Sequence, residues 1–600
     1  MMNLADAAGS ALSFTGKGWR LRAQTSNLHH RLAQQAGLHG MFATILADRG
    51  LTDLQEVERF LRPLLSHLVD PLGLSDMDKA VVRLVQMVEN HQPCAIFGDY
   101  DVDGVTSCAL LYRYFQALGQ PPRIYIPDRL TEGYGPNVAA LRSLRSAGIQ
   151  VVITVDCGIT AYDALQVAAE IGLDVIVTDH HQARPDLPMA VAVVNPNRLD
   201  DPFPHKELAG VGVAFYLVMA LNRALRERGW FGPRTEPDLK SLLDLVAIGT
   251  IADVASLTGL NRSLATVGLR TLATTTKVGL HALMEMARLR GSMNAGQIGF
   301  QIGPRINAGG RLGQGILGAE LLMTDDPAYA MEIATTLEEY NQERQQVERK
   351  ILAESVDQVE SQRLDQKRRG MVVAGEGWHP GVVGIVASRL VERYHRPAIV
   401  MAMDHAGGGK GSARSIPGVD LLAAVTACAD TLLGYGGHRA AAGMTLVPGK
   451  LDALMEAFDQ AVRLNNPPEL FQPVLRVDGE IALDWIDLEL GGRLERLQPF
   501  GRGNPEPVWV ARNVRILDPR ILQERHIRCL LLDQTDSTLD AIAFGVLPGS
   551  LGQGLMQGTA RLDVAGTVSI NRYNNRERMQ FIIKDARPAL GEPLWPHLAL

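Results

Sequence analysis

Residues 95–107, Ala-Ile-Phe-Gly-Asp-Tyr-Asp-Val-Asp-Gly-Val-Thr-Ser, join a short apolar run to three aspartates at alternating positions. The run predicts a strand, and Asp99, Asp101 and Asp103 follow it directly. Side chains two residues apart lie on one side of an extended segment. Their combined negative charge is costly unless cations neutralise it, which indicates a metal site. An exposed acidic turn is the alternative for this segment taken alone.

A calcium-binding EF-hand loop is a second alternative, because Asp-x-Asp-x-Asp-Gly matches the first half of that loop. The twelfth loop position is Leu110, where a bidentate glutamate is needed. A strand also precedes the motif where an EF-hand has a helix. The sequence therefore excludes the EF-hand.

Outward from this motif, apolar runs alternate with helix-like stretches over about residues 78–200. Each run is short and rich in β-branched residues, a pattern typical of a parallel sheet wrapped by helices. Function in such sheets gathers at the carboxyl ends of the strands. The predicted strands are residues 95–97, 124–126, 151–155, 175–177 and 191–194.

Two more of these strands end in residues that bind metals. Asp156 follows one, and the adjacent His180 and His181 follow another after an aspartate. A further carboxylate, Asp253, follows an apolar segment and could cap a helix. Oxygen-rich ligands with one or two imidazoles suit Mn²⁺ or Mg²⁺. Two such ions could activate a water and clamp a phosphoryl group, with Asp156 as a bridging ligand.

The remainder of the chain predicts three further parts. Residues of about 205–320 are mostly helical, and 326–369 predict one long helix of roughly 60 Å as a strut. A coiled-coil dimer is the alternative for that helix, although its apolar heptad repeat is poorly sustained. A second α/β unit begins after Gly370 and closes near Pro467 and Pro468. The strand-rich remainder predicts a small barrel, with an OB-fold as the leading candidate.

Composition narrows the class of protein. The 600 residues exceed one hydrophobic core, so several domains are expected. No apolar run is long enough to cross a bilayer, and we expect no secretory signal. The five cysteines form no Cys-x-x-Cys pair, which fits a reducing cytoplasm. A net charge of −7 neither indicates nor excludes nucleic-acid binding, because a local basic groove matters more.

Basic residues form candidate phosphate sites. The glycine-rich segment 407–415 contains Ser412 and Arg414, and such a loop suits a phosphate, although its glycine content alone favours a mobile hairpin turn. Arg129, Arg305 and Arg311 could be ordinary surface residues, but we expect phosphate contacts from them. The barrel region has basic residues with an interleaved aromatic, which suits a groove for single strands. These residues are Arg520, Arg525, His526, Arg528, Arg572, Tyr573, Arg576 and Arg578.

Four segments, IFGDYDVDGVTS, VDCGIT, TDHH and GTIADVA, resemble in order the four motifs of the DHH phosphoesterase family. RINAGGRLG, GWHPGVVGIVASRL, GKGSARS, GYGGHRAAAG and PFGRGNPEP resemble further blocks of its RecJ branch. The resemblance implies that Asp99 is a ligand or a support, that His181 contacts the scissile phosphate, and that Ser412, Arg414 and His438 hold a terminal phosphate. It implies metal ligation by Asp101, Asp103, Asp156, His180 and Asp253.

The resemblance also implies an activity: hydrolysis of single-stranded DNA from its 5′ end, with release of 5′-mononucleotides, in recombination and repair. The expected partners are single-stranded DNA, a single-strand DNA-binding protein and a DNA helicase, for a monomer with no membrane contact. The expected parts are an N-terminal extension (1–77), a DHH catalytic domain (78–320), a connecting helix (321–369), a DHHA1 substrate-binding domain (370–468) and an OB-fold domain (469–600).

Two other functions stay open at this point. A phosphodiesterase for short RNA or cyclic dinucleotides would share both α/β domains, but dinucleotides need no extended groove, so the barrel and the long helix argue against it. A non-catalytic DNA-binding scaffold would require missing aspartates, and all of them are present.

Overall fold

The computed structural model describes residues 12–128, 131–291, 293–311, 314–558, 560–573 and 576–590. The chain folds as two compact units. One unit combines the residues up to Leu54 with Glu343–Arg496 and Glu506 onward. The other combines Gln55–Gln342 with Leu497–Pro505. The N-terminal segment that the sequence left unassigned is therefore divided between the units.

The unit formed by Gln55–Gln342 and Leu497–Pro505 contains a five-stranded parallel sheet in the order β3-β2-β4-β5-β6. This confirms the predicted parallel sheet, and all five predicted runs form its strands. Their bounds are β2 Cys94–Gly98, β3 Arg123–Tyr125, β4 Val151–Val155, β5 Asp174–Thr178 and β6 Ala192–Val194.

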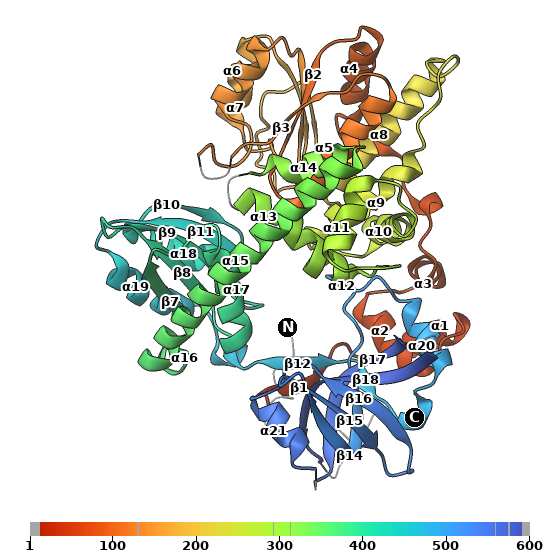
Figure 1. Ribbon diagram of the computed structural model, residues 1–600, viewed down its shortest axis with the longest axis vertical. Helices are drawn as coiled ribbons and strands as arrows, with labels where there is room; N and C mark the ends of the chain where they lie inside the picture. Colours follow the sequence, from red (N-terminus) through yellow and green to blue (C-terminus); the bar gives the residue numbers. More distant parts are fainter. Residues whose placement is uncertain are drawn as a thin grey trace. The chain divides into compact units, whose positions relative to one another are not determined.

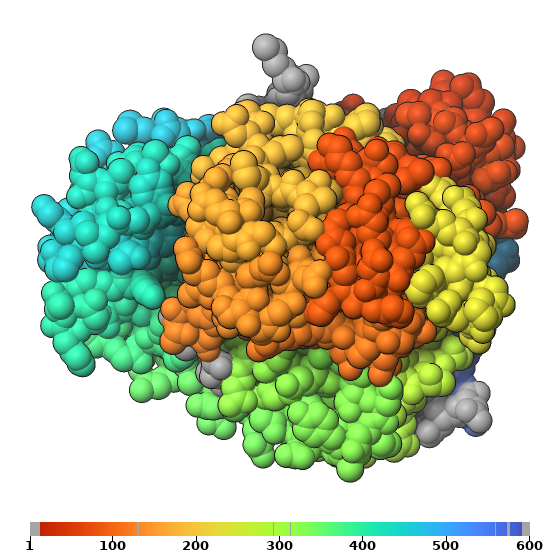
Figure 2. Space-filling view, turned by 90° about the horizontal axis from the view of Figure 1, so that it is seen from above, coloured from red at the N-terminus to blue at the C-terminus, as the bar shows by residue number. Residues whose placement is uncertain are grey.

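Helices cover both faces of this sheet because successive side chains of a strand point to opposite faces. Ala95 and Phe97 pack with α6 (Val138–Ser146) and α7 (Tyr162–Glu170) on one face. Ile96 packs on the other face with α4 (Met77–Glu89), α5 (Val102–Ala117) and α8 (Gly210–Glu227). The orange part of the chain, which contains this sheet and its helices, faces the viewer when the molecule is seen from above (Figure 2).

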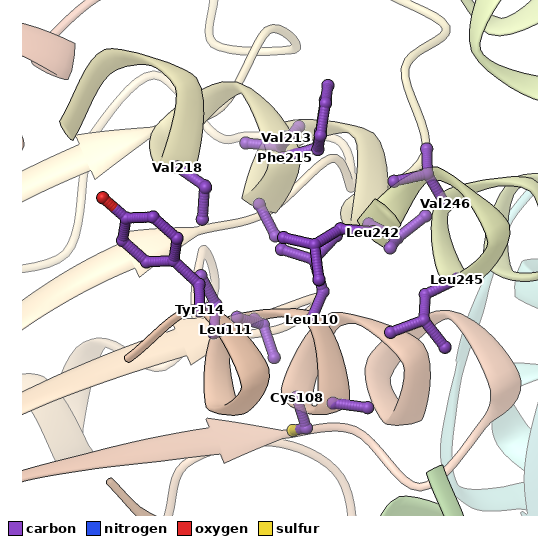
Figure 3. Close-up of a cluster of buried hydrophobic side chains, with 14 of the residues drawn as sticks. Cys108, Leu110, Leu111, Tyr114, Val213, Phe215, Val218, Leu242, Leu245 and Val246 are labelled. Atoms are coloured by element: carbon purple, nitrogen blue, oxygen red, sulfur yellow. The ribbon is translucent and has the colours of Figure 1, made fainter. Parts of the chain in front are cut away.

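The helical half of this unit packs around α5. Leu110, Leu111 and Tyr114 of α5 point toward Val213 and Val218 of α8, with leucines and a valine from the start of α9 beside them (Figure 3). This cluster packs the middle of α5 against α8, and the N-terminal ends of both helices lie at the candidate site. The other helices here are α3 Leu54–Leu61, α9 Leu243–Ala252, α10 Gly259–Leu272, α11 Val278–Met286, α12 Ala295–Gln297, a π-helix Ile298–Ile302, α13 Gly303–Arg311 and α14 Ile316–Met323.

The long helix α15 runs over Pro327–Gln362, 36 residues or about 54 Å (Figure 1). The sequence predicted one helix as far as Arg369. Instead Arg363 adopts a left-handed conformation (φ 54°), and a short helix α16, Leu364–Lys367, follows. A left-handed residue cannot continue the hydrogen-bond ladder of a right-handed helix, so the strut ends at Gln362.

A second, mixed sheet follows in the order β10-β11-β9-β8-β7, with β7 and β8 parallel and the other pairs antiparallel. Its strands are β7 Met371–Glu376, β8 Ala398–Met403, β9 Gly409–Arg414, β10 Leu432–Gly437 and β11 Ala441–Leu446. Its helices are α17 Val383–Tyr394, α18 Leu421–Thr426 and α19 Leu451–Leu464.

The C-terminal strands close into a barrel through the pairs β14–β15, β15–β16, β16–β18, β18–β17 and β17–β14. The order 1-2-3-5-4-1, with the third and fifth strands parallel, confirms the predicted OB-like barrel. The barrel strands are β14 Trp509–Leu522, β15 His526–Leu532, β16 Thr538–Ala543, β17 Leu562–Tyr573 and β18 Arg576–Pro588, accompanied by β12 Val474–Val477, β13 Gly479–Glu480, α20 Leu488–Glu495 and α21 Ser550–Met556.

The N-terminal segment packs with this barrel. Strand β1 (Gly18–Leu21) pairs in parallel with β12. The Trp19 indole N–H donates to Asp585 Oδ2 at 3.0 Å, and its ring lies 4.4 Å from the Arg587 guanidinium carbon. Helices α1 (Asn27–Gln35) and α2 (Ala43–Asp48) follow. In the part of the chain that the structure describes, no helix is long and apolar enough to cross a bilayer.

Candidate active site

Three neighbouring strands, β2, β4 and β5, carry the candidate metal ligands at their carboxyl ends. Parallel neighbours place these ends at one edge of the sheet (Figure 1). Three overlapping groups have ligand atoms within 4.8 Å of one another, and together they contain all seven predicted residues. The groups are Asp99 with Asp101 and Asp156, Asp103 with His180 and Asp253, and Asp156 with His180 and His181.

The aspartates after β2 are positioned by helix starts. Asp101 caps α5, because its Oδ1 accepts from the N–H groups of Asp103 at 2.9 Å and Gly104 at 3.1 Å. Asp103 is fully buried, and its carboxylate accepts from Gly210 N–H at 2.7 Å and Val211 N–H at 2.8 Å. These two donors begin α8, so the positive end of that helix stabilises the charge.

Asp156 is held in a constrained position after β4. Its backbone is left-handed (φ 58°), and its side chain is 2 % exposed. Its Oδ1 lies 3.0 Å from His180 Nε2 and 3.9 Å from His181 Nδ1. No donor among the described residues hydrogen-bonds to this buried oxygen. This buried carboxylate oxygen lies near an imidazole nitrogen but does not form a hydrogen bond with it. Such a pair of ligand atoms suits a bound cation.

The pKa values in the cluster also favour a cation. Burial and the charges of Asp103 and Asp101 raise the pKa of Asp156 well above its ordinary value. The same causes raise the pKa of Asp253, at the end of α9, to about 8. So many carboxylates cannot all ionise together without positive charge nearby. Carboxylates with one or two imidazoles are the donor set that fits Mn²⁺ or Mg²⁺.

Asp179 is the aspartate before the two histidines, and the sequence analysis gave it no role of its own. Its Oδ1 accepts from His181 Nδ1 at 2.8 Å and from the backbone N–H of His180 at 2.7 Å. Burial opposes protonation of His181, but the hydrogen bond and charge of Asp179 outweigh it and raise the His181 pKa to about 9. His181 is therefore an oriented imidazolium with a side chain 39 % exposed. The carboxylate before the two histidines was the available signal.

Tyr134, Asn195 and Asn197 complete the support of the site. Tyr134 donates its hydroxyl to the carbonyl of Asp156 at 3.0 Å. Asn195 and Asn197 donate to the carbonyls of His181 at 2.9 Å and of His180 at 2.5 Å. These bonds hold the turns after β4 and β5 at both ends. Single polar residues at irregular spacing give no recognisable sequence pattern, so they were not predicted.

The predicted phosphate-binding arginines of this unit have different positions. Arg129 lies outside the described residues. Arg305 on α13 forms an ion pair with Glu338 at 2.7 Å and donates to the carbonyl of Gln301. Arg311 ends α13, and the preceding glycine packs against the backbone of Tyr100 in the acidic motif.

The second α/β domain holds the predicted terminal-phosphate residues. The segment with Ser412 and Arg414 was predicted as a loop, but residues 409–414 form strand β9 between β8 and β11. This corrects the prediction, because the strand's backbone N–H groups serve the sheet. Only the side chains are available for a phosphate. Arg414 donates to Ser412 Oγ at 3.0 Å, and both side chains pack closely against Gly384 of α17.

His438 lies next to these two residues through the sheet. It follows β10, is exposed, and donates its backbone N–H to the carbonyl of Ala441 at 2.7 Å. Ala441 is paired with Arg414 across β11 and β9. The backbone therefore places His438 and Arg414 on opposite sides of Ala441 in β11, and a site shared with Ser412 and Arg414 stays a prediction.

Comparison with known proteins gives three consecutive matches. Residues 93–250 match the N-terminal domain of the DHH family, 368–464 match the DHHA1 domain and 477–585 match the RecJ OB domain.

Whole-chain relatives agree. The single-stranded-DNA-specific exonuclease RecJ of Bacillus subtilis is 39% identical over 95% of this chain and 70% of that protein. The RecJ exonuclease of Escherichia coli is 36% identical over 92% of this chain and 96% of that protein. The crystal structure of Thermus thermophilus RecJ in complex with Mn²⁺ covers 95% of this chain and 80% of its own, with a TM-score of 0.77 and 29% identity. The chain belongs to the RecJ family of single-stranded-DNA-specific exonucleases.

Proposed function

We propose that this chain hydrolyses single-stranded DNA from the 5′ end and releases 5′-mononucleotides with the help of two Mn²⁺ or Mg²⁺ ions. The observation that supports this most is the gathering of seven aspartate and histidine side chains around the ends of three adjacent strands. Relatives that match almost the whole chain are named as single-stranded-DNA-specific exonucleases.

Each side chain of the cluster has a role in this proposal. Two bound ions supply an activated water and charge neutralisation at the phosphoryl group. Asp99 is a further ligand or supports its neighbours. The α8 N-terminus and the Asp101 cap fix the carboxylates in place. The ligands would be Asp101, Asp103, Asp156, His180 and Asp253.

His181 would hold the scissile phosphate. Asp179 keeps its ring protonated and oriented, since the carboxylate accepts from Nδ1. The remaining N–H, at Nε2, can then donate to a phosphate oxygen. A charge-assisted hydrogen bond of this kind strengthens as negative charge develops on the phosphoryl oxygens.

The 5′ terminus would bind at Ser412 and Arg414, with His438 beside them. A guanidinium next to a hydroxyl suits a terminal phosphate, which carries more charge than an internal phosphodiester. Arg129, Arg305 and Arg311 stay predicted phosphate contacts. Arg305 would have to exchange its ion pair with Glu338 for such a contact.

The barrel would guide the strand. A groove of about 850 Å³ on the barrel is lined by Arg528, Arg576, Arg578 and Phe544, among others. Phe544 is 56% exposed and packs edge-on against His526. Arginines with an accessible aromatic suit a sequence-tolerant single-strand groove. We further propose a cytoplasmic monomer that works with a single-strand DNA-binding protein and a DNA helicase.

Digestion of a 5′-labelled single-stranded oligonucleotide with Mn²⁺ tests this function. We expect labelled mononucleotide as the first product, and no product from Asp103→Ala. A labelled duplex of the same sequence should persist. Equal persistence of the single strand with wild-type protein and with Asp103→Ala would overturn the proposal.

Arg414→Ala tests the terminal-phosphate site. The variant should lose preference for a 5′-phosphorylated over a 5′-hydroxyl substrate and keep its affinity for Mn²⁺. Arg393→Ala is a matched control, because Arg393 lies in the last turn of the same helix whose first turn carries Gly384. Equal loss of activity on both kinds of end would contradict the assignment.

A further inference from the structure

A short segment from the C-terminal half of the chain belongs to the catalytic unit. Residues Leu497–Pro505 group with Gln55–Gln342, although the residues on both sides of the segment group with the other unit. The segment has its own fixed shape. The Asn504 side chain is buried and donates to the carbonyls of Leu497 at 2.7 Å and Pro499 at 2.9 Å. These residues thus form a loop with its own hydrogen bonds, which we call the 497–505 loop.

This loop is attached immediately after the candidate ligand Asp253. Leu257 N–H donates to the carbonyl of Arg502 at 2.8 Å. A Cβ at Gly501 would meet Leu257 Cδ1 at 2.7 Å, and a Cβ at Gly503 would clash with Ser256 Oγ. Glycines therefore permit the close approach on both sides of the arginine. The attachment point is three to four residues beyond Asp253.

The Arg502 side chain is thereby brought to the metal site. It is exposed, so it is accessible to a ligand in solvent. Its charge acts on Asp253, where it opposes the effects of burial and of the neighbouring aspartates on the pKa. The loop anchors the backbone of Arg502 beside residues 256 and 257, and its side chain stays exposed.

The net charge of the site favours a further cation such as Arg502. The cluster together with Asp179 contains six aspartates, and two divalent ions with the His181 imidazolium leave one negative charge over. A phosphodiester of the substrate adds another, so the approaching strand needs a further cation. Arginine suits phosphate because its donors match the phosphate oxygens in pairs.

We infer that Arg502 binds a phosphodiester of single-stranded DNA beside the metal ligand Asp253, adjacent to the bond that is cleaved. The inference rests on the proposed nuclease function and adds a substrate-positioning residue to it. A rigid loop from the chain segment just before the barrel would then take part in every substrate complex at the metal centre.

The inference is tested by equilibrium binding of a single-stranded oligonucleotide without an end label, in Ca²⁺ and at several salt concentrations. The affinity of Arg502→Gln is compared with that of wild type. Loss of one phosphate contact should weaken binding about tenfold and reduce the slope of log affinity against log salt by about one. In Mn²⁺, KM should rise about tenfold while kcat stays within about twofold. Arg502→Lys should keep the salt slope, because it keeps the charge.

Arg270→Gln is the matched control, because Arg270 is exposed at the far end of α10, about 16 Å along that helix from its start. It should change neither salt slope nor KM. A wild-type salt slope in Arg502→Gln would overturn the inference. A fall in Mn²⁺ affinity equal to the fall in DNA affinity would also overturn it, since that indicates a structural role.

A second measurement uses the unmodified protein. Single-stranded DNA should protect Arg502 from phenylglyoxal in Ca²⁺, and absence of protection would count against the contact. Failure of the nuclease proposal is distinguishable, because it shows as absence of cleavage by wild type. The binding and protection results do not require cleavage.

Discussion

At Gly210, the addition of a single methyl group should weaken metal binding while helix α8 stays folded. It starts α8, and its N–H donates to Asp103 Oδ2. A Cβ there would lie 2.9 Å from Asp156 Cβ and Oδ1 and 3.1 Å from Asp103 Oδ2. Ordinary van der Waals contact begins at 3.4 Å, so Asp156 must move by at least half an ångström in Gly210→Ala.

The magnitude follows from what such a shift does to ligands. Loss of correct support around a metal typically costs about 10–100-fold in affinity or activity. Alanine is otherwise preferred over glycine in a helix by up to about 1 kcal/mol. We therefore expect Gly210→Ala to bind Mn²⁺ about 10–100-fold more weakly than wild type, while α8 itself stays formed.

Calorimetric titration with Mn²⁺ and the exonuclease assay measure the effect, and circular dichroism reports the helix. Gly212→Ala, two residues further along α8, is the control. Its Cβ would meet only the end of the Leu208 side chain, at 3.2 Å, and that side chain can rotate away. Mn²⁺ affinity in Gly210→Ala equal to that in Gly212→Ala would refute the reasoning.

Three further predictions follow from the site and the barrel. Asp179→Asn should move the alkaline limb of the pH–rate profile to lower pH, because His181 acts in its protonated form and activity is lost as pH rises through its pKa. At pH 8, a pKa of about 9 leaves about 90% of His181 protonated, against about 3% at the ordinary pKa of 6.5, so the rate at pH 8 should fall about 30-fold. An alkaline limb at the wild-type pH would contradict this prediction. Mn²⁺ binding at pH 7 should release at least one proton, since the carboxyl of Asp253, with a pKa of about 8, is mostly protonated in the metal-free protein and the pKa of Asp156 is raised as well. Calorimetry in buffers of different ionisation enthalpy checks this, and buffer-independent heats would disprove it. Trp19→Ala should destabilise the barrel by about 3–5 kcal/mol, because a buried indole and its bond to Asp585 are lost; urea unfolding with a wild-type midpoint would argue against this packing.

The parallel sheet could be predicted because its strands are buried on both faces and appear as continuous apolar runs. The gathering of the candidate ligands could be predicted because parallel strands bring their carboxyl ends together, so Asp156 and His180 had to lie near the Asp99–Asp103 motif. The strand at Ser412 was missed because glycine content normally indicates a turn. In β9 the glycines instead allow close packing, as at Gly411 against Met401 and Met444.

Contacts between distant segments explain the remaining differences. Nothing local in the segment around Arg502 indicates that it attaches beside Asp253, about 250 residues earlier. The division of the N-terminal segment between two units likewise depends on pairing with β12. Asp179 and Tyr134 act through hydrogen bonds whose partners are set by the folded turns. Such partners have no periodic signature in a single sequence.

The pairing of β1 with β12 has a consequence for biosynthesis. About 450 residues separate the two strands, and at about 5–20 residues per second the ribosome needs roughly 25–90 s to make them. Residues Gln55–Gln342, the larger part of the catalytic unit, are synthesised within that interval, whereas its 497–505 loop follows β12. The N-terminal strand, with Trp19, must wait in an unpaired state for the barrel to emerge. The N-terminal strand β1, although it is made first, should thus be among the last segments to fold, together with the barrel.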